Sequence, residues 1–275
     1  MRKFAMHDTK FPMIIILNLV LLSCILLSGN ALAYMTIKVN HDHIKIDTFY
    51  HGSAVTVRGI SDPGTDLVIK ITSPECSQDL RKKGKVAGIL WMNTGELKFE
   101  NVPNLYFLGS TGKFGDILSP DEGDKYLIGY SPLKAHTEIK SVVSKSLPPE
   151  SLSGDEKTRW FNEFVKLKED SRLYFISPEK ISITMADGRQ QYFIKFDWPY
   201  EAPAGNYLVT AYAVKDKKVV EEAEGNVLVE QVGVVKALAN MAEEKGALYG
   251  MMSIIVALGA GFGVGIIFRK GGGAH

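Results

Sequence analysis

The stretch Ala202-Pro203-Ala204-Gly205-Asn206-Tyr207-Leu208-Val209 leads from a corner of small residues into an alternating segment that continues to Val214. A period of two residues between apolar and other side chains is typical of a β-strand with one buried face. In sandwich domains, a tyrosine at such a corner bonds through its hydroxyl to backbone a few residues upstream. The stretch therefore predicts a sandwich strand with Tyr207 as the corner residue.

Similar strand-like runs lie on both sides of this segment and of a central region of different character. Asp62-Pro63-Gly64, Asp187-Gly188 and Asp216-Lys217 supply turns between runs, and Thr94-Gly95 is expected to join two of them. The runs, each short and alternating or rich in β-branched residues, cover 35–39, 43–49, 54–58, 66–71, 86–93, 96–99, 180–185, 191–196, 206–214 and 226–232.

The central region contains the clearest helix pattern of the body, at about 154–169. Ser153 and Glu156 have the spacing of a capping box. Trp160, Phe164 and Leu167 recur at helical spacing, and Phe161 and Val165 widen this apolar stripe. The stripe predicts a face packed against the core rather than a ligand-binding aromatic face.

The order of these elements predicts a mainly β fold. We expect an immunoglobulin-like β-sandwich over 34–233, interrupted by a helical insertion at about 103–173. The alternative is two domains in tandem, an all-β domain to about Pro103 and an α+β domain after it.

The N-terminal segment 1–33 has the parts of an export signal. Arg2, Lys3 and Lys10 precede the apolar run 12–27, and Ala31-Leu32-Ala33 offers a small-residue cleavage site before Tyr34. An uncleaved anchor is the alternative.

The C-terminal segment 247–268 is free of charge and long enough to cross a bilayer as one helix. Arg269 and Lys270 follow it, so the positive-inside rule predicts a cytoplasmic tail at 269–275 and a body outside the cytoplasm. Residues 234–246 read as a short juxtamembrane helix at the membrane surface, without a flexible linker on either side. These features predict a single-pass protein of a cell inner membrane, with its body in the periplasm.

Four glycines of this segment form two overlapping pairs, Gly259 with Gly263 and Gly261 with Gly265. Small residues four apart let a second helix approach the backbone closely in a membrane. They predict either a membrane-protein partner or self-association through this helix.

Composition excludes some classes of function. The chain has 32 Lys and Arg against 31 Asp and Glu, and removing 1–33 leaves a net charge near −1, so nucleic-acid binding is not expected. Cys76 is the single cysteine of the body and lies in the loop-like stretch 73–77, where it cannot form an internal disulfide and is expected to be idle.

No cofactor motif or catalytic constellation is present, so an enzyme is not expected. His41 and His43 are the weak candidates for a metal site, because on one strand they would point the same way. No third ligand follows at a diagnostic spacing.

A basic run, Lys82-Lys83-Gly84-Lys85, is expected in a hairpin loop and is followed almost at once by the apolar stretch 88–93 with Trp91. This abrupt change makes the region, with Trp91, a candidate contact surface.

Several short motifs occur along the chain: Gly84-Lys85-Val86 with Leu90-Trp91-Met92-Asn93, Asn101-Val102-Pro103 before Tyr106, and Leu248-Tyr249-Gly250 with Phe268-Arg269-Lys270. Together with the N-terminal segment they resemble the proteobacterial putative transmembrane protein family, over nearly the whole chain to Lys270. The resemblance implies an inner-membrane protein with a periplasmic body and an accessory role near a permease. It supplies no activity, so no catalytic residue is carried over.

The sequence thus predicts a single-pass, membrane-anchored periplasmic accessory or binding protein that works with a membrane partner such as a permease. The alternative is a periplasmic metal-handling protein or enzyme that uses His41 and His43.

Overall fold

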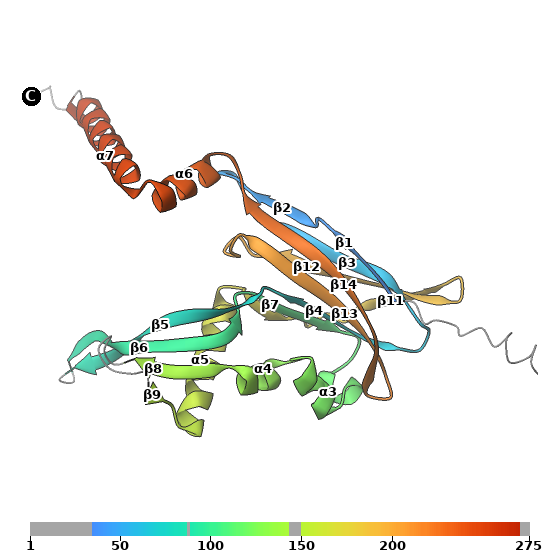
Figure 1. Cartoon of the computed structure of the whole chain (residues 1–275). Coiled ribbons are helices and arrows are strands. Elements are labelled where there is room, and N and C mark those ends of the chain that lie inside the picture. The colour runs from blue at the N-terminus through green and yellow to red at the C-terminus, as the bar shows by residue number, and fades with distance from the viewer. Residues whose placement is uncertain (1–34, 87–88, 143–149, 270–275) are drawn as a thin grey trace, which may run out of the picture. The chain divides into compact units, whose positions relative to one another are not determined.

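The computed structural model describes residues 35–86, 89–142 and 150–269 (Figure 1). The predicted signal at 1–33 and the tail beyond Arg269 lie outside the described residues.

A six-stranded sheet forms the middle layer of the body (Figure 1). Its two edge pairs, β10 with β7 and β14 with β2, are parallel, and its other pairs are antiparallel. In spatial order its strands are β10 (Tyr174–Ile176), β7 (Tyr106–Ser110), β4 (Asp66–Thr72), β13 (Gly205–Lys215), β14 (Lys218–Gln231) and β2 (His43–Ile46).

A four-stranded antiparallel sheet packs on one face of this middle layer. Its order is β1 (Thr36–Asn40), β3 (Ser53–Ser61), β12 (Arg189–Trp198) and β11 (Ser182–Ala186). The longest pairing in it joins β3 to β12, from Ser53 opposite Trp198 to Ser61 opposite Gln190. Strands from before and after the central region are therefore hydrogen-bonded in one sheet.

The other face of the middle layer is covered by the central region of the chain. This region contributes a second four-stranded sheet, in the order β5 (Glu75–Val86), β6 (Leu90–Pro103), β8 (Glu138–Val142) and β9 (Glu150–Ser151). It also contributes four helices, α2 (Phe114–Ile117), α3 (Pro120–Lys125), α4 (Tyr130–His136) and α5 (Gly154–Asp170).

Because side chains alternate across a strand, the middle sheet serves two separate cores. On β4, Leu67 and Ile69 pack into the sandwich core, whereas Val68 packs into the core beneath the helices. On β13, Ala211 packs into the sandwich core and Tyr212 packs into the core beneath the helices. Strands β4, β7 and β13 are buried on both faces, which accounts for their apolar residues at consecutive positions.

The predicted mainly β class is confirmed, and so is the corner tyrosine. The hydroxyl of Tyr207 donates to the carbonyl oxygen of Pro203 at 2.5 Å. The orders β1-β3-β12-β11 and β4-β13-β14 match the A-B-E-D and C-F-G orders of immunoglobulin domains, which supports the immunoglobulin-like assignment. That assignment and the domain boundaries stay predictions.

Two-residue turns close two hairpins as expected. Asp187 and Gly188 both have positive φ, 52° and 72°, and so do Asp216 and Lys217, with 51° and 64°. Positive φ at both central residues is the geometry of a type I′ turn, whose twist matches that of the strands it joins.

Residues 90–93 of the predicted strand run 86–93 and the whole predicted run 96–99 lie in β6, but the prediction missed β5 and the continuity of β6. Cys76 and the basic run Lys82–Lys85 lie on β5 rather than in loops, and Thr94-Gly95 lies inside β6 rather than at a turn. No residue of the described stretch 75–85 is fully buried, so this strand lacks the apolar alternation by which strands are found in a sequence.

Helix α5 begins as predicted, and its buried face differs from the predicted one at Leu167. The Glu156 carboxylate accepts from the backbone N–H of Ser153 at 3.4 Å and from its hydroxyl at 3.0 Å. Leu167 is 47% exposed, and Lys168 takes the buried position instead. The core lies against Phe161, Phe164, Val165 and Lys168, so the predicted role of Leu167 was wrong.

Beyond the sandwich, β14 is followed by α6 (Gly233–Glu244) and α7 (Gly246–Arg269). A single residue, Lys245, separates the two helices.

Candidate functional site

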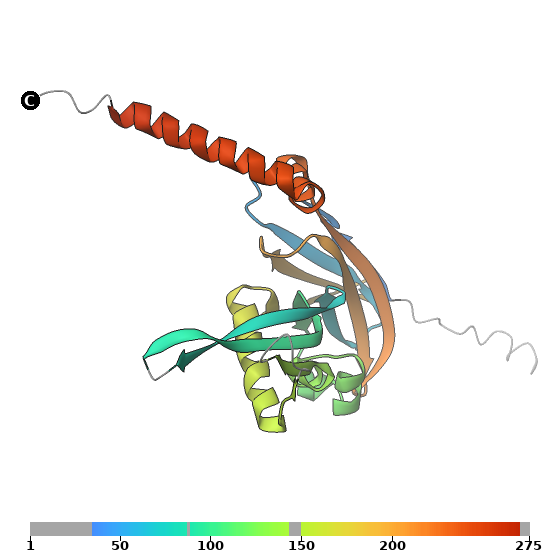
Figure 2. The same cartoon turned by 60° about the vertical axis from the view of Figure 1, so that its left-hand side comes forward.

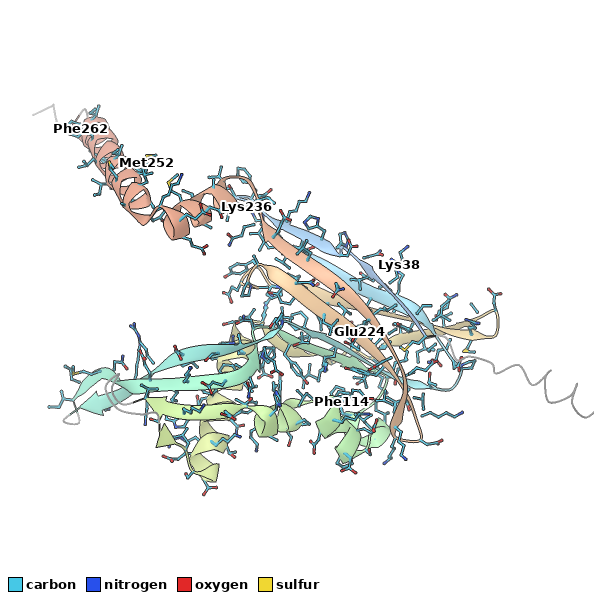
Figure 3. The ribbon with its side chains drawn as sticks, in the orientation of Figure 1. Lys38, Phe114, Glu224, Lys236, Met252 and Phe262 are labelled. Atoms are coloured by element: carbon cyan, nitrogen blue, oxygen red, sulfur yellow. The ribbon has the colours of Figure 1, made fainter. Side chains whose placement is uncertain are left out.

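Helix α7 has the character of a membrane span. Among the described residues it is the one helix long and apolar enough to cross a membrane, over Gly246–Ile266 with a mean hydropathy of 1.8. Its side chains, including the labelled Met252 and Phe262, point outward without packing on the body (Figure 3). The hydroxyl of Ser253 donates to the carbonyl oxygen of Tyr249 at 2.8 Å, which satisfies it within the helix as a lipid environment requires.

The glycines of α7 are not equivalent. A groove of about 490 Å³ runs along one face, and its lining residues are Ala257, Leu258, Gly261, Phe262, Gly265 and Ile266. Successive residues turn by about 100° around a helix, so Gly259 and Gly263 lie on the opposite face. Apart from the neighbouring backbone of the helix itself, no atom of the described residues lies within 4 Å of a Cβ placed on any of the four glycines, which leaves both faces open to a partner.

Helix α6 has an apolar side that the protein leaves uncovered. None of its residues is buried. Val234 and Leu238 lie one turn apart and are largely exposed, while Lys236 and Asn240 lie on the other side of the helix. The ammonium of Lys236 lies 3.9 Å from the Glu230 carboxylate, at the end of β14. A helix of this pattern joined directly to a span fits the plane of the bilayer interface.

The two candidate metal ligands do not share a strand. His41 lies between β1 and β2 with a positive φ of 60°, and His43 is the first residue of β2. The ring nitrogen Nε2 of His43 lies 3.2 Å from the Glu230 carboxylate. The premise that both rings point the same way along one strand was therefore wrong, because the chain turns at His41. Within the described ranges, no three His, Cys, Asp or Glu side chains gather closely enough to hold a metal ion.

The predicted contact residue Trp91 lies on β6 opposite Lys85, and its side chain is outside the described part of the chain. The neighbouring Lys82 instead reaches Trp160 of α5, with its ammonium 5.1 Å from the ring centroid. Arg159 lies on the same ring at 4.6 Å. Trp160 is thereby covered by two cations.

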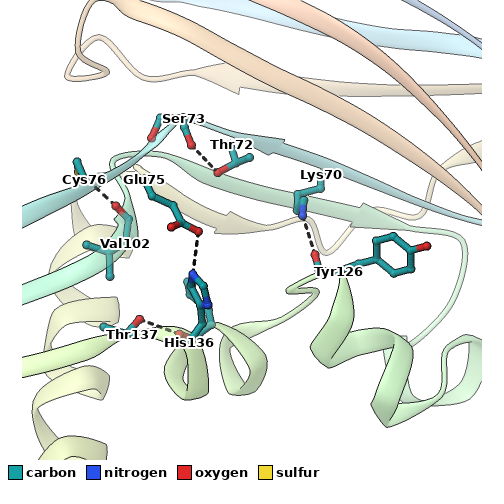
Figure 4. Close-up of polar contacts among 10 residues, drawn as sticks. Lys70, Thr72, Ser73, Glu75, Cys76, Val102, Tyr126, His136 and Thr137 are labelled. Carbon is teal, nitrogen blue, oxygen red and sulfur yellow. Dashed lines mark hydrogen bonds and ion pairs between the residues drawn. The ribbon is translucent and has the colours of Figure 1, made fainter.

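The structure also contains a partly buried lysine that no sequence pattern indicated. Lys70 lies on the β4 face beneath the helices, and its ammonium donates to the carbonyl oxygen of Tyr126 at 2.6 Å (Figure 4). It lies 5.6 Å from the ring centroid of Tyr212. Burial lowers the pKa of Lys70 to about 8, although Glu222 and Glu75 oppose that shift. The alternation of β4 marks Lys70 as solvent-facing, and only the fold covers it.

Cys76 lies beside a second buried lysine. Its thiol donates to the carbonyl oxygen of Val102 at 3.2 Å (Figure 4), and the hydroxyl of Tyr174 donates to the next carbonyl, that of Pro103, at 2.9 Å. The ammonium of Lys168 lies 5.9 Å from the ring centroid of Tyr174. Burial lowers the pKa of Lys168, and the nearby Cys76 acts in the opposite direction. The Cys76 thiol, the Tyr174 hydroxyl and the Lys168 ammonium thus lie close together near the end of β6. They form a packed polar cluster.

A cleft of about 620 Å³ lies where β3 begins and β12 ends, next to the end of α5. Asp170, Arg172, Asp197 and Glu201 give it mixed charge. Trp198 also lines it, and the buried indole N–H of this residue has no hydrogen-bond partner among the described residues.

A family model described as "Putative transmembrane protein (Alph_Pro_TM)" matches residues 34–270. The match begins at the residue that would follow the predicted cleavage site and runs through α7. No curated protein matches the chain.

Proposed function

The chain belongs to the Alph_Pro_TM family of transmembrane proteins, and from that premise we propose that it is a single-pass accessory protein anchored by α7. Its β-rich body lies outside the cytoplasm, and its membrane helix docks on a partner helix in an inner membrane. The groove along Gly261 and Gly265 is the observation that carries this proposal.

Docking through this groove has a physical basis. Lipid offers no hydrophobic drive for helix association, so close backbone packing at small residues takes its place. Ala257, Gly261 and Gly265 follow one another at intervals of four, with Leu258 and Phe262 beside them. A partner side chain can enter between these larger residues.

The body supports the same role through its attachment. The distance from the end of β14 to the start of α7 is spanned by α6 alone, so the body is tethered closely to the span.

The test is affinity purification of the full-length protein from crosslinked native membranes, with the bound proteins identified by mass spectrometry. We expect a stoichiometric membrane protein, such as a permease. Gly261→Leu with Gly265→Leu should lower its recovery about tenfold, since filling the groove removes packing worth about 1–2 kcal/mol.

Gly259→Leu with Gly263→Leu is the matched control, because it makes the same change on the opposite face. Its recovery of the partner should stay near that of the unchanged protein. Absence of any membrane protein above background, or loss of binding only in the control pair, would contradict the proposal.

A further inference from the structure

The β5–β6 hairpin extends beyond the sheet that supports it. Within the described residues, β8 pairs with β6 over Glu96–Glu100, and no third strand of these residues pairs with the hairpin beyond Glu96. In both ribbon views this part reaches past the helices that cover the middle sheet (Figure 2). An isolated two-stranded ribbon is only marginally stable in water, so a contact with another surface would stabilise this part of the hairpin.

The described end of the hairpin is apolar and uncovered. Ile89 is 84% exposed, Leu90 60% and Met92 48%. Three large apolar side chains thus lie exposed within four residues. Removing apolar surface from water is favourable by about 25 cal/mol for each Å², so a contact that buries them would be stabilising.

The strand beside these residues is basic. The segment 80–95 contains four basic residues and no acidic one. Arg81 and Lys83 are exposed. The Arg81 guanidinium lies 4.0 Å from the carboxylate of Glu96, where the pairing with β8 begins. The hairpin therefore combines an apolar end with a positively charged shaft.

We propose that the end of the β5–β6 hairpin binds the surface of an anionic bilayer. Ile89, Leu90 and Met92 enter the boundary between headgroups and acyl chains, and the basic shaft lies against the anionic headgroups. The charge sign of the shaft favours this occupant, because anionic lipid attracts each nearby basic residue by about 1 kcal/mol. Tethering by α7 keeps a bilayer within the reach of the body. This inference rests on anchoring by α7 and is independent of the partner proposed above.

The experiment uses the full-length chain in liposomes of phosphatidylcholine, with or without phosphatidylglycerol. Leu90→Cys, in a background with Cys24→Ser and Cys76→Ser, carries an environment-sensitive nitrobenzoxadiazole label. We expect its emission to shift to the blue in phosphatidylglycerol liposomes and to be quenched by lipids that carry a doxyl group on the acyl chain. High salt, or Arg81→Glu with Lys83→Glu, should abolish both effects because screening or charge reversal removes the attraction.

A label at Ser182→Cys, an exposed position on β11, is the matched control and should give the same emission in both lipids. Where Leu90→Cys fails to fold, Ile89→Cys gives the same readout. Equal emission and no quenching in both lipids would overturn the proposal. A blue shift that requires native membrane proteins would overturn it too, and would assign the hairpin to a protein partner.

Discussion

At the scale of single residues, Lys70 shows how coverage by a distant segment changes the chemistry of a side chain. Its ammonium is held by one carbonyl oxygen, from Tyr126, and by the face of the Tyr212 ring. Partial removal from water disfavours the charged form, which is why its pKa falls to about 8. The group is therefore charged at neutral pH and loses its proton within a mildly alkaline range.

This lowered pKa predicts a stability that rises with pH. Between pH 8 and 9.5 the folded protein releases the Lys70 proton while the unfolded chain, with a pKa near 10.5, keeps it. The unfolded state then binds more protons, so the free energy of unfolding should increase by about 1.5 kcal/mol over this range. Thermal unfolding of the full-length protein in mild detergent, followed by circular dichroism at several pH values, measures it.

Lys70→Met is the control for this prediction, since it keeps an apolar stem and removes the titrating group. It should flatten the rise, leaving the part due to Lys168, whose pKa is lowered as well. Above pH 10 the trend should reverse, because burial raises the pKa of Tyr207 and Tyr212 to about 12 and the unfolded tyrosines ionise first. An unchanged slope in Lys70→Met would contradict the assignment.

At the scale of elements, α5 carries a lysine in the middle of its buried face. Lys168 is 8% exposed and lies 5.5 Å from the ring centroid of Phe164, without an ion pair among the described residues. Ring contact only partly replaces the water that its ammonium loses. The helix is held by Phe161, Phe164 and Val165, so the lysine is tolerated rather than required for packing.

We therefore expect Lys168→Met to stabilise the protein by about 1 kcal/mol, because a flexible apolar side chain fills the same space without a desolvated charge. Lys166→Met, on the exposed side of the same helix, is the matched control and should change stability by less than about 0.5 kcal/mol. Paired thermal melts in one detergent compare the two. Destabilisation by Lys168→Met would indicate a polar partner for the ammonium.

At the scale of the whole molecule, the charges that flank the span predict its orientation. Arg269 ends α7, and Lys270 follows it, whereas the residues before Gly246 are of mixed sign. The positive-inside rule predicts that the basic end lies in the cytoplasm. The body and the β5–β6 hairpin would then share the compartment on the other side of the membrane.

This orientation predicts opposite labelling of two single-cysteine variants in a background free of Cys24 and Cys76. In intact spheroplasts, a membrane-impermeant maleimide should label Ser182→Cys on the exposed face of β11 and should leave Gly272→Cys unlabelled until the cells are lysed. The reverse pattern would place the body in the cytoplasm and remove the basis of the accessory role.

Local signals and bilayer physics allowed part of this protein to be derived from its sequence alone. The span at 247–268 depends on length and polarity, which the bilayer requires of any crossing helix. The start of α5 at Ser153 and the turn at Asp187-Gly188 depend on residues a few positions apart. Tyr207 belongs to the same class, because its partner Pro203 lies four residues upstream.

Only the tertiary structure decided which surfaces are covered. Lys70 and Lys168 carry no sequence sign of burial, since the segments that enclose them are distant in the chain. Strand β5 was not predicted because none of its residues at 75–85 is fully buried, so its sequence shows no alternation of apolar and polar side chains. His41 left its expected strand because the chain turns there to bring β2 beside β14. For the two lysines and for His41, the outcome depends on packing between remote segments, which local patterns do not encode.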